Sequence, residues 1–169
     1  MTIRIMLADD HGIVRAGLAS LINKEPGMAV VGEAENGRRA VELVREMKPD
    51  VVVMDLTMPE MSGFEATRQI VADCPDTRVL ALSMHSDKRF VAEALNAGAS
   101  GYLLKDCAFE ELIRAVTVVT SGQVYLSPGV AGTVVDTYVR NPKAMHLSTL
   151  SNLTPREREV LQLIAEGKN

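Results

Sequence analysis

The sequence from Asp50 to Gly63, D-V-V-V-M-D-L-T-M-P-E-M-S-G, changes character at Asp55. Residues 51–54 form a short, continuous apolar run, which is typical of a strand buried on both faces of a parallel sheet. A segment rich in turn-forming residues follows at 57–63, and a helical pattern begins after it. Because open α/β sheets bind ligands at the carboxyl ends of their strands, Asp55 stands where a functional carboxylate is expected. The alternative is that Asp55 only caps the turn that follows, and this stretch alone does not decide between the two.

The composition is that of a globular protein, with 169 residues, 47% of them hydrophobic and 24% charged. No apolar run approaches the roughly 20 residues that span a bilayer, and the N-terminus lacks the pattern of a signal peptide. The two cysteines, Cys74 and Cys107, have no metal-ligand spacing and are expected to be reduced thiols. We therefore expect a cytoplasmic protein without membrane contact. The net charge of −4 argues against a general nucleic-acid coat but leaves room for a separate DNA-binding module.

Short apolar runs alternate with helical patterns across the first 122 residues, and we expect strands at 3–7, 28–34, 51–54, 78–82 and 102–104. This alternation predicts an α/β fold with a doubly wound, five-stranded parallel sheet of flavodoxin-like order 2-1-3-4-5. The expected helix N-caps are Asn36, Ser62, Ser86 and Asp106. The first helix, from about His11 to Lys24, is expected to bury Val14, Leu18, Leu21 and Ile22 on one face.

Every candidate chemical residue follows a predicted strand: Asp9 and Asp10 the first, Asp55 the third, Ser83 the fourth and Lys105 the fifth. In the predicted strand order these side chains converge on one crevice, which favours a functional interpretation of Asp55. Two adjacent acids repel each other unless a positive charge lies between them. Mg²⁺ supplies such a charge, since it takes one or two carboxylates and keeps several waters. The alternative is an acidic pair that only begins a helix, where the helix dipole favours negative charge.

His11 directly follows the acidic pair, which suggests a metal ligand. No other ligand-type spacing supports that role, so we interpret His11 as a surface residue or a neighbour of the ligands.

Four features together resemble the receiver domain of bacterial two-component response regulators: the D-D pair, the D-L-x-M-P-x-M-x-G loop, the lone Ser83 and the G-Y-L-L-K run. The resemblance spans residues 2 to about 122. It implies that Asp55 accepts a phosphoryl group and that Mg²⁺ binds Asp9, Asp10, Asp55 and the backbone carbonyl of Thr57. It also implies that Lys105 contacts the phosphoryl group, and that Ser83 and Tyr102 form a conformational switch.

The same resemblance implies a partner histidine kinase, and a switch rather than an enzyme. Only self-phosphorylation from small phosphodonors and slow autodephosphorylation are expected of it. Three residues are candidates for tuning the dephosphorylation rate. Met84 is bulkier than the small residue that many receivers carry there, and Thr57 and His85 flank the expected path of the attacking water.

Residues 153–169, L-T-P-R-E-R-E-V-L-Q-L-I-A-E-G-K-N, resemble the first helix of the LuxR-type helix-turn-helix domain of NarL-type regulators. Thr154 with Glu157 forms a capping box, and Gly167 is a stop signal. Ser127-Pro128 begins a further helix, and the polar chain after it indicates a linker. We predict a receiver domain at 1–122, a helical linker and connection at 123–152, and the start of a truncated DNA-binding domain at 153–169. Promoter DNA is therefore an expected partner of the full-length protein only.

Two other functions remain open at this stage. Asp55-Leu56-Thr57 matches the D-x-T nucleophile motif of haloacid dehalogenase-type phosphatases, although that motif normally closes the first strand. A stand-alone receiver that acts through protein–protein contacts is the second. A homodimer is compatible with the response-regulator interpretation. A dinucleotide-binding fold is excluded because no G-x-G-x-x-G follows the first strand.

Overall fold

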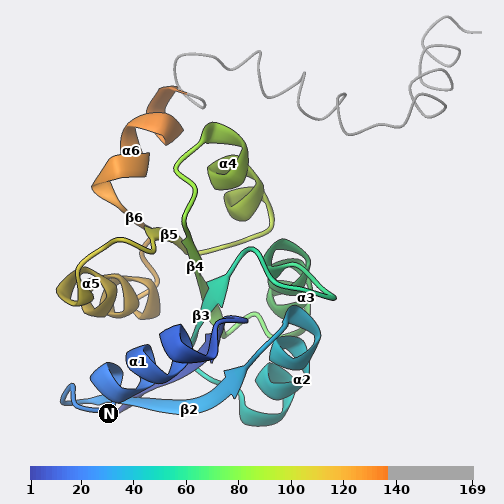
Figure 1. The fold of residues 1–169 in the computed structure, drawn as a ribbon, viewed down its shortest axis with the longest axis vertical. Coiled ribbons are helices and arrows are strands. Elements are labelled where there is room, and N and C mark those ends of the chain that lie inside the picture. The colour runs from blue at the N-terminus through green and yellow to red at the C-terminus, as the bar shows by residue number, and fades with distance from the viewer. Residues whose placement is uncertain (137–169) are drawn as a thin grey trace, which may run out of the picture. The chain divides into compact units, whose positions relative to one another are not determined.

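The computed structural model describes residues 1–136, which contain a six-stranded parallel sheet of order β2-β1-β3-β4-β5-β6 (Figure 1). The strands are β1 (Ile3–Ala8), β2 (Met28–Ala34), β3 (Val51–Asp55), β4 (Arg78–Ser83), β5 (Gly101–Leu104) and β6 (Tyr125–Leu126). The predicted fold class and the order of the first five strands are confirmed. Strand β3 lies between β1 and β4, and all five of its residues are buried, as its apolar run predicts.

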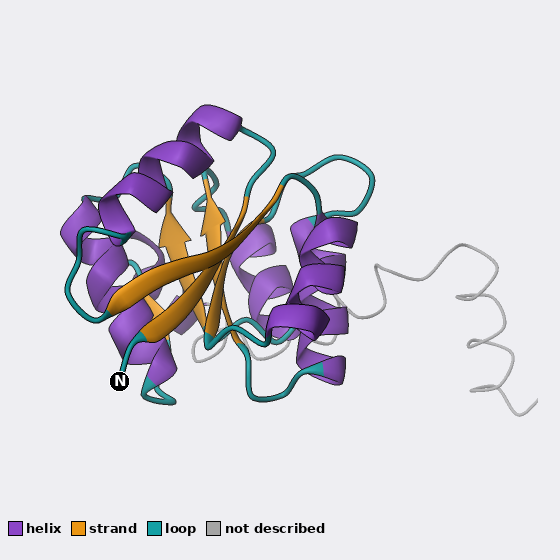
Figure 2. Ribbon diagram, turned by 90° about the horizontal axis from the view of Figure 1, so that it is seen from below, coloured by secondary structure: helices purple, strands orange, loops and turns teal. Residues whose placement is uncertain are grey.

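The helices form a layer on each side of the sheet (Figure 2). They are α1 (Gly12–Ile22), α2 (Gly37–Met47), α3 (Gly63–Asp73), α4 (Lys88–Asn96), α5 (Phe109–Thr120) and α6 (Pro128–Val135). Helices α1 and α5 cover one face, and α2, α3 and α4 cover the other (Figure 1). Each face has its own apolar cluster, one including Ile22 of α1 and Leu112 of α5, the other including Val44 of α2 and Ile70 of α3. This arrangement is the doubly wound fold that alternating strands and helices produce.

Strand β6 is the one part of the sheet that the sequence did not predict. Its two residues pair with Gly101 and Tyr102 of β5. A strand of two residues has no hydrophobic period, so pattern alone cannot reveal it. The strand lies within the segment predicted as a linker, at 123–152. The predicted start of α6 at Pro128 is observed, and the predictions for residues after 136 lie outside the described residues.

Two of the four predicted helix caps are wrong. Asn36 and Ser62 do accept backbone N–H groups, from Arg39 at 2.8 Å and from Glu65 at 3.3 Å. Helix α4, however, is capped by Asp87 rather than Ser86, because the Asp87 carboxylate accepts two N–H groups of the first turn. Helix α5 begins after Ala108, not after Asp106, and Ala108 offers no side-chain cap. Asp106 instead lies in a turn in which the Cys107 N–H donates to the Leu104 carbonyl at 3.1 Å.

The predicted buried face of the first helix is also partly wrong. Ile22 is fully buried and Leu18 is half-buried, but Val14 is 39% exposed and Leu21 is 43% exposed. Ala19 and Ile22 are the α1 residues that enter the core cluster. The neighbouring stripe of Val14, Leu18 and Leu21 lines a groove between α1 and α5.

Within residues 1–136, no helix is both long enough and apolar enough to cross a membrane.

Candidate functional site

The carboxyl ends of the central strands bring the predicted chemical residues together. Lys105 follows β5, and its Nζ donates to Asp9 Oδ2 and to Asp55 Oδ2, at 2.8 Å in each case. Asp9 follows β1, and Asp55 is the last residue of β3, so one ammonium group joins three strand ends. The predicted convergence of these three residues is therefore observed. Their functional roles remain predictions.

The net pKa shift differs between the two carboxylates, although both are 3% exposed. Burial raises the pKa of Asp55, and the hydrogen bonds from Lys105 and from the Thr57 N–H only partly oppose it. Burial also acts to raise the pKa of Asp9, but the bonds from Lys105 and from the His11 N–H outweigh it and lower that pKa. The pKa of Lys105 is raised, since its two carboxylate partners outweigh the effect of burial. Ionisation is therefore less favourable for Asp55 than for Asp9.

Asp10 and His11 complete the cluster on its exposed side. His11 Nδ1 lies 3.0 Å from Asp9 Oδ1 and 3.0 Å from Asp10 Oδ1. One ligand-type atom from each of Asp9, Asp10, His11 and Asp55 lies within 4.8 Å of the others. Carboxylate oxygens are the ligands that Mg²⁺ prefers, so this donor set fits a divalent cation between β1 and β3.

The loop after β3 holds Asp55 in place. Its Oδ1 accepts the N–H of Thr57 at 3.1 Å, so Asp55 caps the turn and joins the cluster at the same time. Gly63 begins α3 against this turn, and a Cβ there would lie 2.0 Å from the Asp55 carbonyl oxygen. The glycine of the M-S-G sequence is therefore required by the close approach of two backbone segments.

Ser83 and Tyr102 are connected through the backbone of His85. The Ser83 hydroxyl accepts the His85 N–H at 3.1 Å, and the Tyr102 hydroxyl donates to the His85 carbonyl at 2.5 Å. Ser83 is 2% exposed, and Tyr102 is fully buried rather than placed with its hydroxyl in water. Burial raises the pKa of Tyr102, which remains a neutral hydrogen-bond donor.

The residues considered for tuning lie around the rim. Met84 is 73% exposed, and Thr57 and His85 are exposed as well. The His85 ring stacks on Phe90 of α4, with ring centroids 4.1 Å apart. Thr57 contacts Asp55 through its N–H, Met84 lines the same groove as Lys105, and His85 donates its N–H to Ser83.

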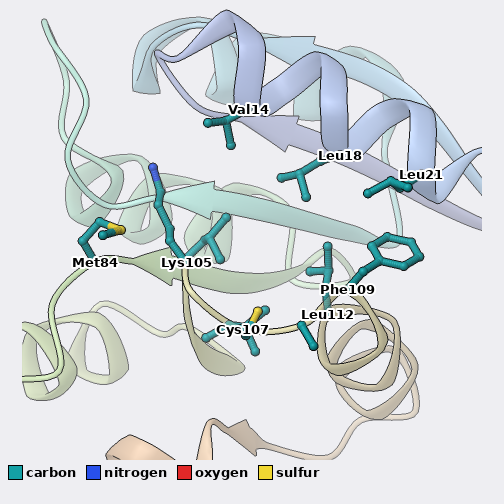
Figure 3. Close-up of a pocket in the computed structure, with 11 residues that line it drawn as sticks. Val14, Leu18, Leu21, Met84, Lys105, Cys107, Phe109 and Leu112 are labelled. Carbon is teal, nitrogen blue, oxygen red and sulfur yellow. The ribbon is translucent and has the colours of Figure 1, made fainter.

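An apolar groove adjoins the cluster between α1 and α5, with a volume of about 420 Å³. Figure 3 shows Val14, Leu18 and Leu21 projecting from α1 toward Phe109 and Leu112 across the groove. Lys105 and Met84 lie at the end of the groove nearest Val14 (Figure 3). The ammonium group that contacts Asp9 and Asp55 thus belongs to a side chain that also lines this groove.

Two basic residues lie beside the cluster. His11, predicted as a surface residue or a neighbour of the ligands, is exposed and lies against both acids, whereas Arg15 was not considered from the sequence. Arg15 donates from Nη1 to the Asp9 carbonyl at 2.6 Å and from Nε to Glu33 Oε2 at 3.2 Å. The available signal was spacing, since Arg15 lies four residues after His11 and so on the same face of the first helical turn.

Comparisons with known proteins agree with this geometry. The family model described as the response regulator receiver domain matches residues 5–117. The chain is 40% identical, over 98% of its length, to the transcriptional regulatory protein DegU of Brevibacillus brevis, of which it covers 75%. It is 37% identical, over 96% of its length, to the nitrate/nitrite response regulator protein NarL of Escherichia coli (strain K12), of which it also covers 75%.

The structural comparison leads to the same class. A crystal structure of a LuxR-family two-component response regulator from Aurantimonas sp. SI85-9A1 matches with a TM-score of 0.78 and 44% identity, over 82% of this chain and 99% of that one. The fold is that of a receiver domain. The chain belongs to the response regulator receiver family, as a two-component regulator related to LuxR-family transcriptional regulators. Response regulators are not conventional enzymes.

Proposed function

We propose that Asp55 is the phosphoryl acceptor of this response regulator. The observation that carries the proposal is the pair of 2.8 Å contacts from Lys105 Nζ to Asp9 and Asp55. They hold a positive charge beside a buried carboxylate at the end of a central strand. A carboxylate can attack phosphorus and form an aspartyl-phosphate. Phosphoryl transfer depends mainly on positioning and on neutralising charge, which this arrangement provides.

In the transfer, a carboxylate oxygen of Asp55 forms a bond to phosphorus while the bond from phosphorus to the donor breaks. The donor is a phosphohistidine of the kinase or a small phosphodonor, and it leaves with the electron pair of that bond. Lys105 passes from the carboxylates to a phosphoryl oxygen, as a point charge with three donors. Burial leaves the Asp55 carboxylate poorly solvated, which disfavours its ionised form and raises its pKa. The hydrogen bond from Lys105 partly offsets this effect.

We assign the cation site to Asp9, Asp10, Asp55 and the backbone carbonyl of Thr57, with Mg²⁺ as the ion. The donor set is rich in oxygen, and Asp10 lies on the side open to solvent, which suits an ion that keeps several waters. When bound, Mg²⁺ supplies positive charge that offsets the three carboxylates and the incoming phosphoryl group.

We propose Ser83 and Tyr102 as the switch. A new phosphoryl anion at Asp55 offers an acceptor to the Ser83 hydroxyl, and that hydroxyl also holds the His85 N–H. Movement of Ser83 therefore changes the position of His85, whose carbonyl accepts from Tyr102. Two hydrogen bonds to one residue couple the phosphorylation site to the β4–α4 loop and to β5.

The stability of the phosphorylated state would be tuned at the rim. Thr57, Met84 and His85 lie where water reaches the site, and all three are exposed. We propose that Met84 narrows the approach to Asp55, because it flanks Lys105 at the mouth of the groove. We also propose self-phosphorylation from small donors and slow autodephosphorylation at Asp55.

The proposed partners are a cognate histidine kinase and, for the full-length protein, promoter DNA. A kinase that delivers a phosphoryl group to Asp55 must approach the carboxyl edge of the sheet. The groove between α1 and α5 opens at that edge beside Lys105, and we propose that the kinase docks there. Residues 1–122 would act as the receiver, 123–152 as the linker and 153–169 as the beginning of the DNA-binding domain, in the cytoplasm and with a homodimer as a compatible state.

The acceptor is tested by intact-protein mass spectrometry after incubation with acetyl phosphate and Mg²⁺. We expect one added phosphoryl group in the wild type and none in Asp55→Asn. Asp76→Asn is the matched control, because Asp76 is exposed in the turn before β4, and it should be labelled like the wild type. Equal labelling of wild type and Asp55→Asn would overturn the assignment.

The phosphatase alternative is disfavoured by the position of its motif. Asp55-Leu56-Thr57 begins at the last residue of β3, whereas the dehalogenase-type motif closes a first strand, and β1 here ends before Asp9 and Asp10. Family membership points the same way.

A further inference from the structure

His11 has a fixed relationship to both acids of the pair. Its backbone N–H donates to Asp9 Oδ1 at 2.8 Å, and its ring Nδ1 lies 3.0 Å from that same oxygen. The ring Nδ1 also lies 3.0 Å from Asp10 Oδ1. The local turn at the start of α1 therefore sets the direction of the imidazole, although the side chain itself is 65% exposed.

These separations match neighbouring ligands on an octahedral ion. With metal–ligand bonds of about 2.0–2.1 Å, two ligands at right angles are about 3.0 Å apart. Nδ1 of His11 has that separation from one oxygen of each acid. In the structure Nδ1 is placed to donate its proton to these carboxylates, so coordination requires that this proton is released as the ion binds. With that proton gone, an ion bound between Asp9 and Asp10 has His11 Nδ1 within reach as a third ligand without a change in the backbone.

An imidazole ligand changes which ion a carboxylate site prefers. Carboxylates, carbonyls and water suit Mg²⁺, while imidazole nitrogen suits first-row transition metals. We propose that His11 is a nitrogen ligand of the cation site and that it shifts the preference of the site from Mg²⁺ toward Mn²⁺. The proposal rests on the cation site assigned above, and it adds a specificity-determining residue that the family resemblance did not imply.

The direct test is the coordination of Mn²⁺ in the untagged 169-residue protein. Pulsed electron paramagnetic resonance detects the magnetic coupling of a bound ¹⁴N nucleus to Mn²⁺. We expect imidazole ¹⁴N coupling in the wild type and its loss in His11→Gln. His85→Gln is the matched control, because His85 is also exposed and lies on the other flank of the site, and it should keep the coupling. Far-UV circular dichroism should be unchanged in both variants.

Affinity gives a second, independent readout. By competition, we expect Mn²⁺ affinity to fall on the order of tenfold in His11→Gln, with Mg²⁺ affinity changing far less. If Mn²⁺ binds the wild type without ¹⁴N coupling, His11 is only a hydrogen-bonding neighbour and the inference is overturned, while the cation site stands. If Mn²⁺ does not bind, or binds Asp10→Asn as tightly as the wild type, the cation site itself is wrong and both proposals fall.

Discussion

Helices α1 and α2 have the same length, eleven residues, but they differ in how far their apolar side chains are buried. Helix α2 buries Ala40, Val41, Leu43 and Val44. Helix α1 leaves Ile13 91% exposed, with Val14 at 39% and Leu21 at 43%. The ends of the two helices differ as well. Asn36 caps α2 through its side chain, whereas His11 makes no side-chain cap for α1.

This difference in burial indicates that α2 mainly stabilises the fold, whereas α1 also serves the functional site. Helix α2 has the burial and the cap that stabilise a helix, and it contributes nothing to the cluster at the carboxyl edge. Helix α1 begins at that cluster, and its exposed stripe lines the groove beside Lys105. Apolar side chains that are left in water beside a functional site are available to a partner. We therefore expect substitutions in α2 to change the free energy of unfolding, and substitutions in α1 to change the rate of phosphoryl transfer from the kinase.

The largest expected effect is that of a charge placed in α2. Val44 is fully buried, so Val44→Asp places an unpaired carboxylate in the core, at an expected cost above about 4 kcal/mol. Val14→Asp should change the free energy of unfolding by no more than about 0.5 kcal/mol, because Val14 already meets water. Urea unfolding followed by far-UV circular dichroism measures both. Similar losses in the two variants would remove the distinction between the helices.

The second prediction concerns transfer from the kinase. Val14→Asp should lower the rate of phosphoryl transfer from the cognate histidine kinase by about tenfold or more, because a charge on the groove wall opposes an apolar contact. The measurement uses the labelled kinase identified from the neighbouring gene or by profiling a kinase panel. The rate of labelling by acetyl phosphate serves as the internal control and should stay within about twofold, since a small donor needs no groove. Leu21→Asp should behave in the same way. A parallel loss with both donors would mean that the substitution damages the acceptor site rather than docking.

The fold followed from the sequence more fully than the details of the site. The run at 51–54 and its neighbours alternate cleanly with helical patterns, and a parallel sheet buried on both faces leaves few other arrangements. The meeting of Asp9, Asp55 and Lys105 followed from strand order alone, because carboxyl ends of parallel strands share one edge. Strand β6 did not follow, since two residues carry no period.

The errors fall where several residues compete for one role. Ser86 and Asp87 are both good N-cap residues, and the sequence does not show that α4 is capped by Asp87. The exposed stripe of α1 has the same spacing as a buried one, so pattern could not show that Val14 and Leu21 face a groove. The contacts of His11 depend on the direction of a side chain at a helix start, which spacing does not specify.

The third prediction compares the stability contributed by the residues that precede α2 and α1, Asn36 and His11. Asn36→Ala should cost about 1 kcal/mol of unfolding free energy, because the N–H of Arg39 loses its acceptor. His11→Ala should cost less, since the His11 side chain accepts no N–H of α1 and its own backbone N–H still reaches Asp9. Thermal unfolding of the two variants at matched ionic strength tests the order. A larger loss for His11→Ala would show that the start of α1 contributes to stability after all.

The smallest expected effect is a gain in unfolding free energy when Asp55 is replaced by a neutral residue. Burial raises the pKa of Asp55 above its ordinary value of 3.8, so the folded state disfavours the ionised carboxylate that the unfolded chain accepts. Below pH 3.8 the group is protonated in both states and has no effect on stability. As the pH rises through 3.8 and then through the raised pKa, ionised Asp55 increasingly opposes folding.

Asp55→Asn, which is always neutral, should therefore be more stable than the wild type at pH 7 without Mg²⁺, by less than the loss at Asn36. The gain should shrink as the pH is lowered toward 4. The sign is opposite for Asp9, whose pKa is lowered despite burial by Lys105 and the His11 N–H, so Asp9→Asn should lose stability at pH 7. Unfolding free energies across this pH range decide the matter. A loss at Asp55 would mean that the bond to Lys105 outweighs burial.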